Sequence, residues 1–257
     1  MLSGTLRRAV PMLLVAGALL GAAACGGGTG GVFKKQYEYE EELYLSLDGS
    51  ATVNVNASVP ALVALRGADL PVDPRARLDR GKVRALFAGP GVEVTKVSLS
   101  RRDRRRFVHV SVDVAELRRL PQIAPFAWSK YRLTRGAQMV QYEQVIGASA
   151  GKPVGDVGWT GGELVAFRMH IPSRIADNNA TEPTQRGNIL VWEQPLSDRL
   201  RGAPLDLQVA MEPRSILYST LLLFGGTIVA AAITFAVVIW WVSRRGRDTE
   251  LTETTKA

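Results

Sequence analysis

The chain has 257 residues and a formal net charge of +8. Its single cysteine excludes an internal disulfide, and one cysteine with two histidines offers too few ligands for a dedicated zinc site. Residues 66–106 hold 12 Lys or Arg against 5 Asp or Glu, so most of the positive charge comes from one segment.

Residues 1–24 have the pattern of a secretory signal peptide, in which Arg7 and Arg8 precede an apolar run and then small residues. Ala22-Ala23-Ala24-Cys25 resembles the bacterial lipobox, whose cysteine becomes the lipidated first residue of the mature protein. The same alanines satisfy the small-x-small rule of the ordinary signal peptidase, and an uncleaved anchor is a third reading. We expect lipidation of Cys25, with a Gly-rich linker over residues 25–32.

Residues 33–213 predict one α+β domain, a mostly antiparallel sheet with short helices. Its clearest element is a hairpin: tyrosines and leucines alternate with Glu38, Glu40 and Glu42 before the turn at Asp48-Gly49-Ser50. This alternation predicts an exposed acidic face. A short helix follows at 61–65, with Pro60 at its start and Gly67 as its stop.

The rest of the domain predicts alternating short elements. A Gly-rich loop is expected at 151–162 and a polar loop at 175–185. Further helices are expected at 82–88 and 115–120, and further strands at 92–99, 107–114, 130–134, 138–146, 164–171, 188–193 and 205–211.

No catalytic constellation can be assembled from the sequence. His109, Ser111 and Asp113 share one strand face, but residues i, i+2 and i+4 of a strand lie about 7 Å apart, too far for a hydrogen-bonded trio. His170, beside Arg168 on its strand face, is expected to be solvated. No phosphate-binding loop, dinucleotide fingerprint or metal-ligand spacing occurs, so we expect no catalytic residue, cofactor or metal.

The strongest electrostatic feature is the run from Arg101 to Arg106, which contains Arg101, Arg102, Arg104, Arg105 and Arg106. It predicts a hairpin tip that is either simply solvated or in contact with anions. The anions would be phospholipid headgroups, an anionic glycolipid or a phosphate-bearing cell-wall polymer. Nucleic acid is excluded as a partner, because an exported domain without a nucleic-acid-binding fold does not meet it.

Residues 216–242 carry no charge and, as a helix, would span about 40 Å, enough to cross a bilayer with tilt. Residues 243–257 are expected in the cytoplasm and the domain outside, because basic residues follow the apolar run directly. A stripe of Gly226, Ala230 and Thr234 suits packing against a partner helix. The residues expected at the membrane interface are Tyr218, Trp240, Trp241, Arg244 and Arg245.

Short stretches of the C-terminal half resemble the LppM-like domains of bacterial envelope proteins. They are Phe167-Arg168-Met169-His170-Ile171-Pro172, Asn178-Asn179, Gly187-Asn188-Ile189-Leu190-Val191-Trp192 and Pro195-Leu196. The order of export signal, α+β domain, single helix and basic tail is also similar. The resemblance implies an extracytoplasmic envelope domain, with lipid or glycolipid binding suggested for the family.

These features predict a single-pass protein of the bacterial cell membrane, with a binding module for lipid, glycolipid or another envelope component. A structural or assembly protein that contacts other membrane proteins through its domain and helix is the alternative. A hydrolase is the third hypothesis, and it requires a constellation that the sequence does not reveal.

Overall fold

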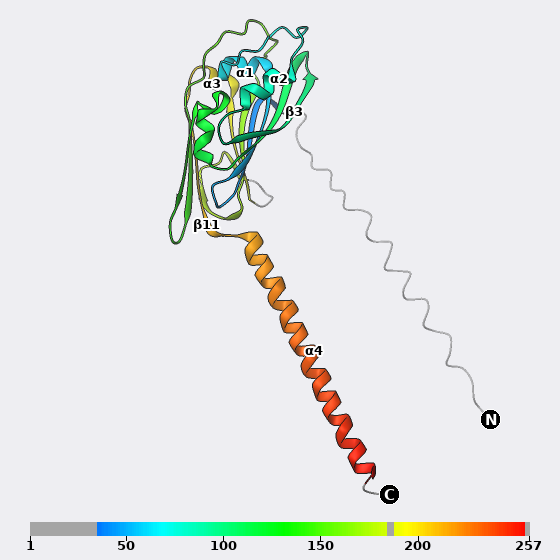
Figure 1. The fold of residues 1–257 in the computed structure, drawn as a ribbon. Helices are drawn as coiled ribbons and strands as arrows, with labels where there is room; N and C mark the ends of the chain where they lie inside the picture. Colours follow the sequence, from blue (N-terminus) through cyan, green and yellow to red (C-terminus); the bar gives the residue numbers. More distant parts are fainter. Residues whose placement is uncertain (1–34, 184–187, 255–257) are drawn as a thin grey trace, which may run out of the picture. The chain divides into compact units, whose positions relative to one another are not determined.

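The computed structural model describes residues 35–183 and 188–254. The predicted signal peptide, Cys25 and the linker over residues 25–32 therefore lie outside the described residues. Within the described ranges the chain forms two β-sheets, a few short helices and one long C-terminal helix (Figure 1). The fold is α+β, as the sequence predicted.

The larger sheet has seven strands in the order β3-β4-β2-β1-β7-β10-β9. Neighbouring strands are antiparallel except for β1 and β7, which are parallel. The strands are β1 (Gln36–Leu45), β2 (Ala51–Ser58), β3 (Val92–Arg102), β4 (Arg105–Val114), β7 (Glu163–His170), β9 (Glu182–Pro183) and β10 (Ile189–Pro195).

A second sheet has four antiparallel strands in the order β5-β6-β11-β8. They are β5 (Ser129–Arg135), β6 (Val140–Ile146), β8 (Ser173–Asn178) and β11 (Leu205–Ser215). The predicted antiparallel sheet is thus divided into two sheets. The polar loop predicted at 175–185 is wrong, because that stretch contains much of β8 and all of β9. β8 lies at a sheet edge with most of its side chains exposed, so it lacks the apolar alternation that marks a half-buried strand.

The short helices are α1 (Val59–Arg66), α2 (Arg80–Phe87), α3 (Leu196–Leu200) and the 3₁₀ turns η1 (Leu117–Gln122) and η2 (Ala124–Phe126). α1 begins where the Ser58 side chain accepts a hydrogen bond from the Ala61 amide, and it ends at Gly67 in the left-handed conformation, with φ 67°. Both ends agree with the sequence prediction. α3 was not predicted, and η1 continues through Pro121 instead of ending before it.

The two sheets are joined by a buried polar network around Glu41 of β1. Its carboxylate accepts hydrogen bonds from the Tyr39 and Tyr131 hydroxyls, each at 3.0 Å, and from the Gln144 side-chain amide at 3.1 Å. Burial raises the pKa of the Glu41 carboxyl, and these three hydrogen bonds only partly oppose the rise. Since Tyr131 and Gln144 belong to the second sheet, this carboxyl fastens one sheet to the other.

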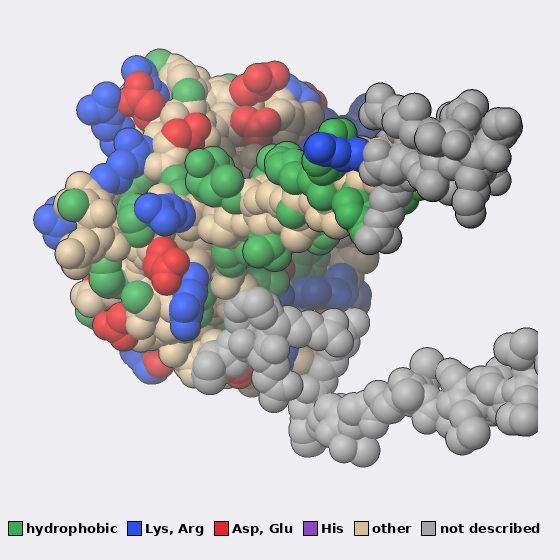
Figure 2. Space-filling model, turned by 90° about the horizontal axis from the view of Figure 1, so that it is seen from below, with side chains coloured by type: hydrophobic (Ala, Val, Ile, Leu, Met, Phe, Trp, Pro, Cys, Tyr) green, Lys and Arg blue, Asp and Glu red, His purple; other side chains and the backbone are tan. Residues whose placement is uncertain are grey.

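The strands of the larger sheet define two ends of the domain. At the first, which we call the arginine end, β1 and β7 begin and the β3–β4 hairpin closes at Asp103–Arg104. At the second, the α4 end, β1 and β7 finish at Leu45 and His170. Figure 2 looks at the domain from below, from the side of the α4 end, where basic, acidic and hydrophobic side chains lie interspersed.

The C-terminal helix α4 (Ile216–Thr254) begins at the α4 end, where the Ile216 amide donates to the Pro172 carbonyl at 3.0 Å. Its segment Ile216–Val242 is long and apolar enough to cross a membrane, and none of its most apolar window is buried. The helix continues beyond the predicted span through most of the predicted tail. The guanidinium of Arg244 lies 5.2 Å from the ring centre of Trp240, so an aromatic and a basic side chain adjoin at the end of the span.

Candidate functional site

The β3–β4 hairpin closes in a two-residue turn, with Asp103 at φ 50° and Arg104 at φ 60°. Two successive positive φ values are typical of a type I′ turn, whose twist matches the flanking strands. Arg101 and Arg102 therefore belong to β3, and Arg105 and Arg106 to β4. The expectation of a solvated tip holds for Arg104 but is wrong for Arg105 and Arg106, which are buried.

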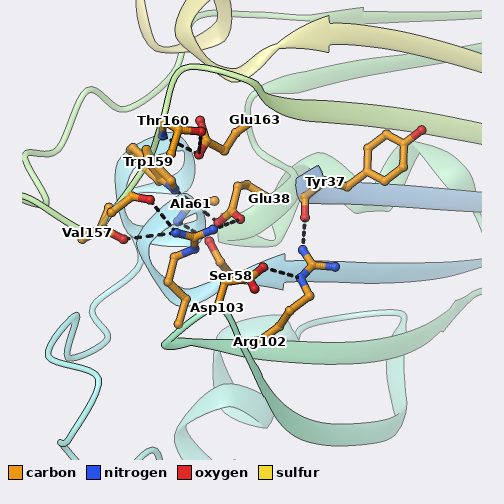
Figure 3. Close-up of polar contacts among 12 residues, drawn as sticks. Tyr37, Glu38, Ser58, Ala61, Arg102, Asp103, Val157, Trp159, Thr160 and Glu163 are labelled. Carbon is orange, nitrogen blue, oxygen red and sulfur yellow. Dashed lines mark hydrogen bonds and ion pairs between the residues drawn. The ribbon is translucent and has the colours of Figure 1, made fainter. Parts of the chain in front are cut away.

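Arg105 forms a buried ion pair with Glu38 of β1. Its guanidinium lies 3.0 Å from one oxygen of the Glu38 carboxylate and donates to the carbonyls of Gly158 at 2.9 Å and Val157 at 3.3 Å. The indole of Trp159 donates to the other Glu38 oxygen at 3.2 Å (Figure 3). Both carboxylate oxygens thus have partners, which a fully buried charge requires.

The acidic face predicted for the first strand is wrong at Glu38, which is fully buried. The cause is a bulge: the register between β1 and β7 shifts between Tyr37 and Tyr39, so that Glu38 has no partner on β7. A bulge of this kind turns a side chain toward the other face of the sheet. Glu41 is also buried, on the apolar face of the strand.

The loop over residues 151–162 is held to the arginine end at its last residues. Glu163, at the start of β7, accepts from the backbone amide of Thr160 at 2.7 Å (Figure 3). It also accepts from the backbone amide of Gly161 at 2.8 Å. Burial opposes ionisation of this carboxyl, but the amide hydrogen bonds outweigh it and the pKa of Glu163 is lowered. The loop has no regular secondary structure, as predicted, yet Trp159 and Glu163 tie it to the sheet.

Arg106 and Arg102 are also engaged by the protein. The guanidinium of Arg106 donates to the carbonyls of Pro71 and Ala76, which fastens the loop before α2 to β4. Arg102 donates to the Tyr37 carbonyl at 2.6 Å and lies over the Phe107 ring. These contacts position the hairpin and leave Arg101 and Arg104 as the exposed members of the run whose guanidinium groups have no hydrogen bond or ion pair with the described residues.

The structure adds two exposed arginines that the sequence reading did not single out. Arg75 and Arg77 lie in the loop before α2 and line a groove of about 500 Å³ together with Arg101 and Arg106. The surplus of basic residues over 66–106 was the only sequence signal for this groove. It could not show that Arg77 and Arg101 lie close together, because they are 24 residues apart in the sequence. The Arg106 contacts to this loop bring the two segments together.

A second, larger cleft of about 780 Å³ borders the hairpin turn itself. Arg104, Arg105 and Arg106 line it, but three carboxylates, those of Asp73, Asp103 and Asp156, line it too. The basic and acidic side chains balance in this cleft, whereas no acidic residue lines the smaller groove. The excess positive charge is therefore concentrated in the groove.

The polar face of β4 pairs with its neighbouring strands. Ser111 donates to the Asn54 side chain at 2.7 Å, and Asp113 accepts from Thr52 at 2.6 Å, so these residues do not contact His109 as catalytic partners would. The two nitrogens of His109 lie 2.8 Å from Ser100 Oγ and 2.8 Å from Asn56 Oδ1. Burial, and then the charges of Arg102 and Lys96, lower the pKa of His109 and favour its neutral form.

His170 lies at the α4 end. The sequence predicted it to be solvated, but in the structure it contacts two other side chains. Its Nε2 is 2.6 Å from a Glu42 carboxylate oxygen, and its ring stacks on Tyr44 at 4.0 Å. Both rings line a groove of about 810 Å³ that also includes Val92 and Pro172. Among the described residues, no group of three or more His, Cys, Asp or Glu side chains is placed to hold a metal ion.

Comparison with known proteins gives structural similarity but no sequence match. No protein-family model and no curated protein matches the sequence. Among solved structures, the chain is similar to the folded domain of LppM from Mycobacterium tuberculosis, determined by NMR. The identity is 12%, the alignment covers 72% of this chain and 95% of that chain, and the TM-score is 0.39. This agrees with the family that the sequence resembles, at a similarity too low to carry an argument about function.

Proposed function

We propose that the protein is a membrane-anchored binding module that takes up an anionic component of the cell envelope at its arginine end. The observation that carries this proposal is the exposure of Arg101 and Arg104, whose side chains have no partner among the described residues while their neighbours in the run are all engaged. A guanidinium group that no protein acceptor satisfies is a strong donor for an external anion.

The anchoring part of the proposal rests on α4. Its span of 27 residues has a mean hydropathy of 2.5, which suits a bilayer and not water. We place the domain outside the cell because Arg244 and Arg245 directly follow the span. A lipid on Cys25 would be a second anchor, and palmitate labelling of the wild type against Cys25→Ala tests it, since the chain has no other cysteine.

The binding proposal is tested by mass spectrometry of what stays bound to the full-length protein after gentle extraction in a non-ionic detergent at low salt. We expect an anionic envelope compound on the wild type and its loss from the variant Arg101→Gln/Arg104→Gln. The control is Lys96→Gln/Lys130→Gln, which removes the same charge from exposed positions outside both arginine-lined hollows. An anionic compound that neither variant loses, or none on the wild type, contradicts the proposal.

One observation favours a second candidate, a hydrolase. Ser100 Oγ, His109 and Asn56 lie in series at hydrogen-bond distances, the arrangement of a nucleophile, a general base and an orienting group. The lowered pKa of His109 suits a base at neutral pH. Covalent labelling by a serine-reactive fluorophosphonate that is lost in Ser100→Ala would support this candidate, and no labelling of the wild type would reject it.

A further inference from the structure

We infer that the groove between the loop over residues 71–79 and the end of β3 binds an extended phosphate-bearing polymer. This inference rests on the binding function proposed above and names the ligand and its place. The groove of about 500 Å³ is lined by four arginines, Arg75, Arg77, Arg101 and Arg106, and by Ala76, Leu78, Leu99 and Ser100. Every charged residue in this lining is an arginine, whose planar fork binds phosphate oxygens bidentately.

Three of these arginines are available to a ligand. Arg75, Arg77 and Arg101 are exposed, and their guanidinium groups make no hydrogen bond or ion pair with any described residue. Arg75 and Arg77 come from the loop over 71–79 and Arg101 comes from β3, so the three positive charges are distributed along the groove and not clustered at one turn. Phosphates that repeat along a chain can meet such points together, whereas one isolated anion cannot satisfy all of them.

The fourth arginine builds the groove. Arg106 is 5% exposed and donates hydrogen bonds to the Pro71 and Ala76 carbonyls, so it holds the loop against β4. Leu78 and Leu99 are half-buried against the core and give the groove an apolar floor. The exposed guanidinium groups therefore extend from a backbone that is fixed before any ligand binds, which lowers the ordering cost of binding.

The position of the groove separates this ligand from the headgroups around α4. Arg101 lies nine residues along β3 from Val92, a distance of about 30 Å in a strand. Val92 lines the groove at the α4 end together with Pro172, whose carbonyl accepts from the first amide of α4. With the domain upright on the membrane, the potential of a charged bilayer, which decays over a Debye length of about 8 Å at physiological salt, has little effect on the arginines over about 30 Å.

The test uses the full-length protein in nanodiscs of zwitterionic lipid, titrated with polyphosphate of defined chain length at low salt. We expect Arg75→Gln/Arg77→Gln to bind about 25-fold more weakly than the wild type, about fivefold for each arginine. The slope of log affinity against log salt should also become shallower. The control Lys96→Gln/Lys130→Gln, with the same net charge, should bind like the wild type, and orthophosphate should compete only weakly.

Several outcomes would overturn the inference. Equal losses in the arginine pair and in the lysine control would mean that only net charge matters. Stronger binding to phosphatidylglycerol vesicles than to polyphosphate would assign the groove to a lipid headgroup. Loss of binding in Arg104→Gln but not in the arginine pair would place the ligand on the turn, so the proposed function would stand and the groove would fail. No binding of polyphosphate to the wild type would reject the polymer outright.

Discussion

The ion pair between Arg105 and Glu38 should be a main determinant of stability at the arginine end. Glu38 is 0% exposed and Arg105 is 6% exposed, so Arg105→Met would leave a carboxylate in the interior with only the Trp159 indole as a partner. Removing one member of a buried pair costs about 3–5 kcal/mol of unfolding free energy. For a domain of this size, each kcal/mol lowers Tm by about 2–4 °C, so we expect a fall of roughly 10 °C.

The assay is unfolding of the full-length protein in detergent micelles, followed by tryptophan fluorescence, with Trp159 beside the pair as a local reporter. The matched control is Arg104→Met, which removes the neighbouring exposed guanidinium and should change stability by less than about 1 kcal/mol. The double variant Arg105→Met/Glu38→Met should recover much of the loss, because no unpaired charge then remains buried. A loss for Arg105→Met no greater than that of its control would refute the argument.

Three other features give measurable consequences. Because burial raises the folded pKa of Glu41, its stabilising contribution is complete below the unfolded pKa of about 4.3 and is lost as pH rises through the folded pKa. Glu41→Gln should therefore flatten the fall of Tm with rising pH, and an unchanged profile would assign that fall to other groups. Arg106→Met should release the loop over 71–79, seen as faster amide exchange there than at 151–162. Asp103→Asn/Arg104→Gly should stabilise the hairpin by about 1 kcal/mol, since Asn-Gly suits two positive φ values, and a lower Tm would contradict the turn type.

Local signals in the sequence predicted local structure well. The β1–β2 hairpin follows from alternation and from the turn at Asp48-Gly49-Ser50, and α1 follows from Pro60 and Gly67. The span of α4 follows from its length and lack of charge, and in the structure the helix begins at the predicted residue, Ile216, and continues past Val242. Each of these signals is complete within about 30 residues, so no distant contact was needed to read it.

The parts that failed depend on contacts between distant residues. The sequence predicts that Glu38 is exposed. In the structure it is buried, because of a bulge against β7 and an ion pair with Arg105, which lies 67 residues away in the sequence. The sequence predicts five arginines within six positions to share one hairpin tip, either solvated or in contact with anions, whereas β-strand alternation and a two-residue turn give them different environments. The groove itself needs Arg106 to bring the loop over 71–79 to β3, and a sequence pattern contains no signal for a side chain that bonds to backbone carbonyls.

The parallel pairing of β1 and β7 constrains how the protein can be tethered. The first residue of β1, Gln36, lies at the arginine end, whereas α4 begins at the opposite end of strands about 30 Å long. If Cys25 carries a lipid, the chain between it and Gln36 has a maximum reach of about 36–40 Å. Two anchors in one bilayer would then need almost all of that length, or a domain lying along the membrane. Shortening this stretch by a few residues would therefore require the domain to lie along the membrane. Lengthening it would allow the domain to stand upright on the membrane, with the arginine end away from the bilayer.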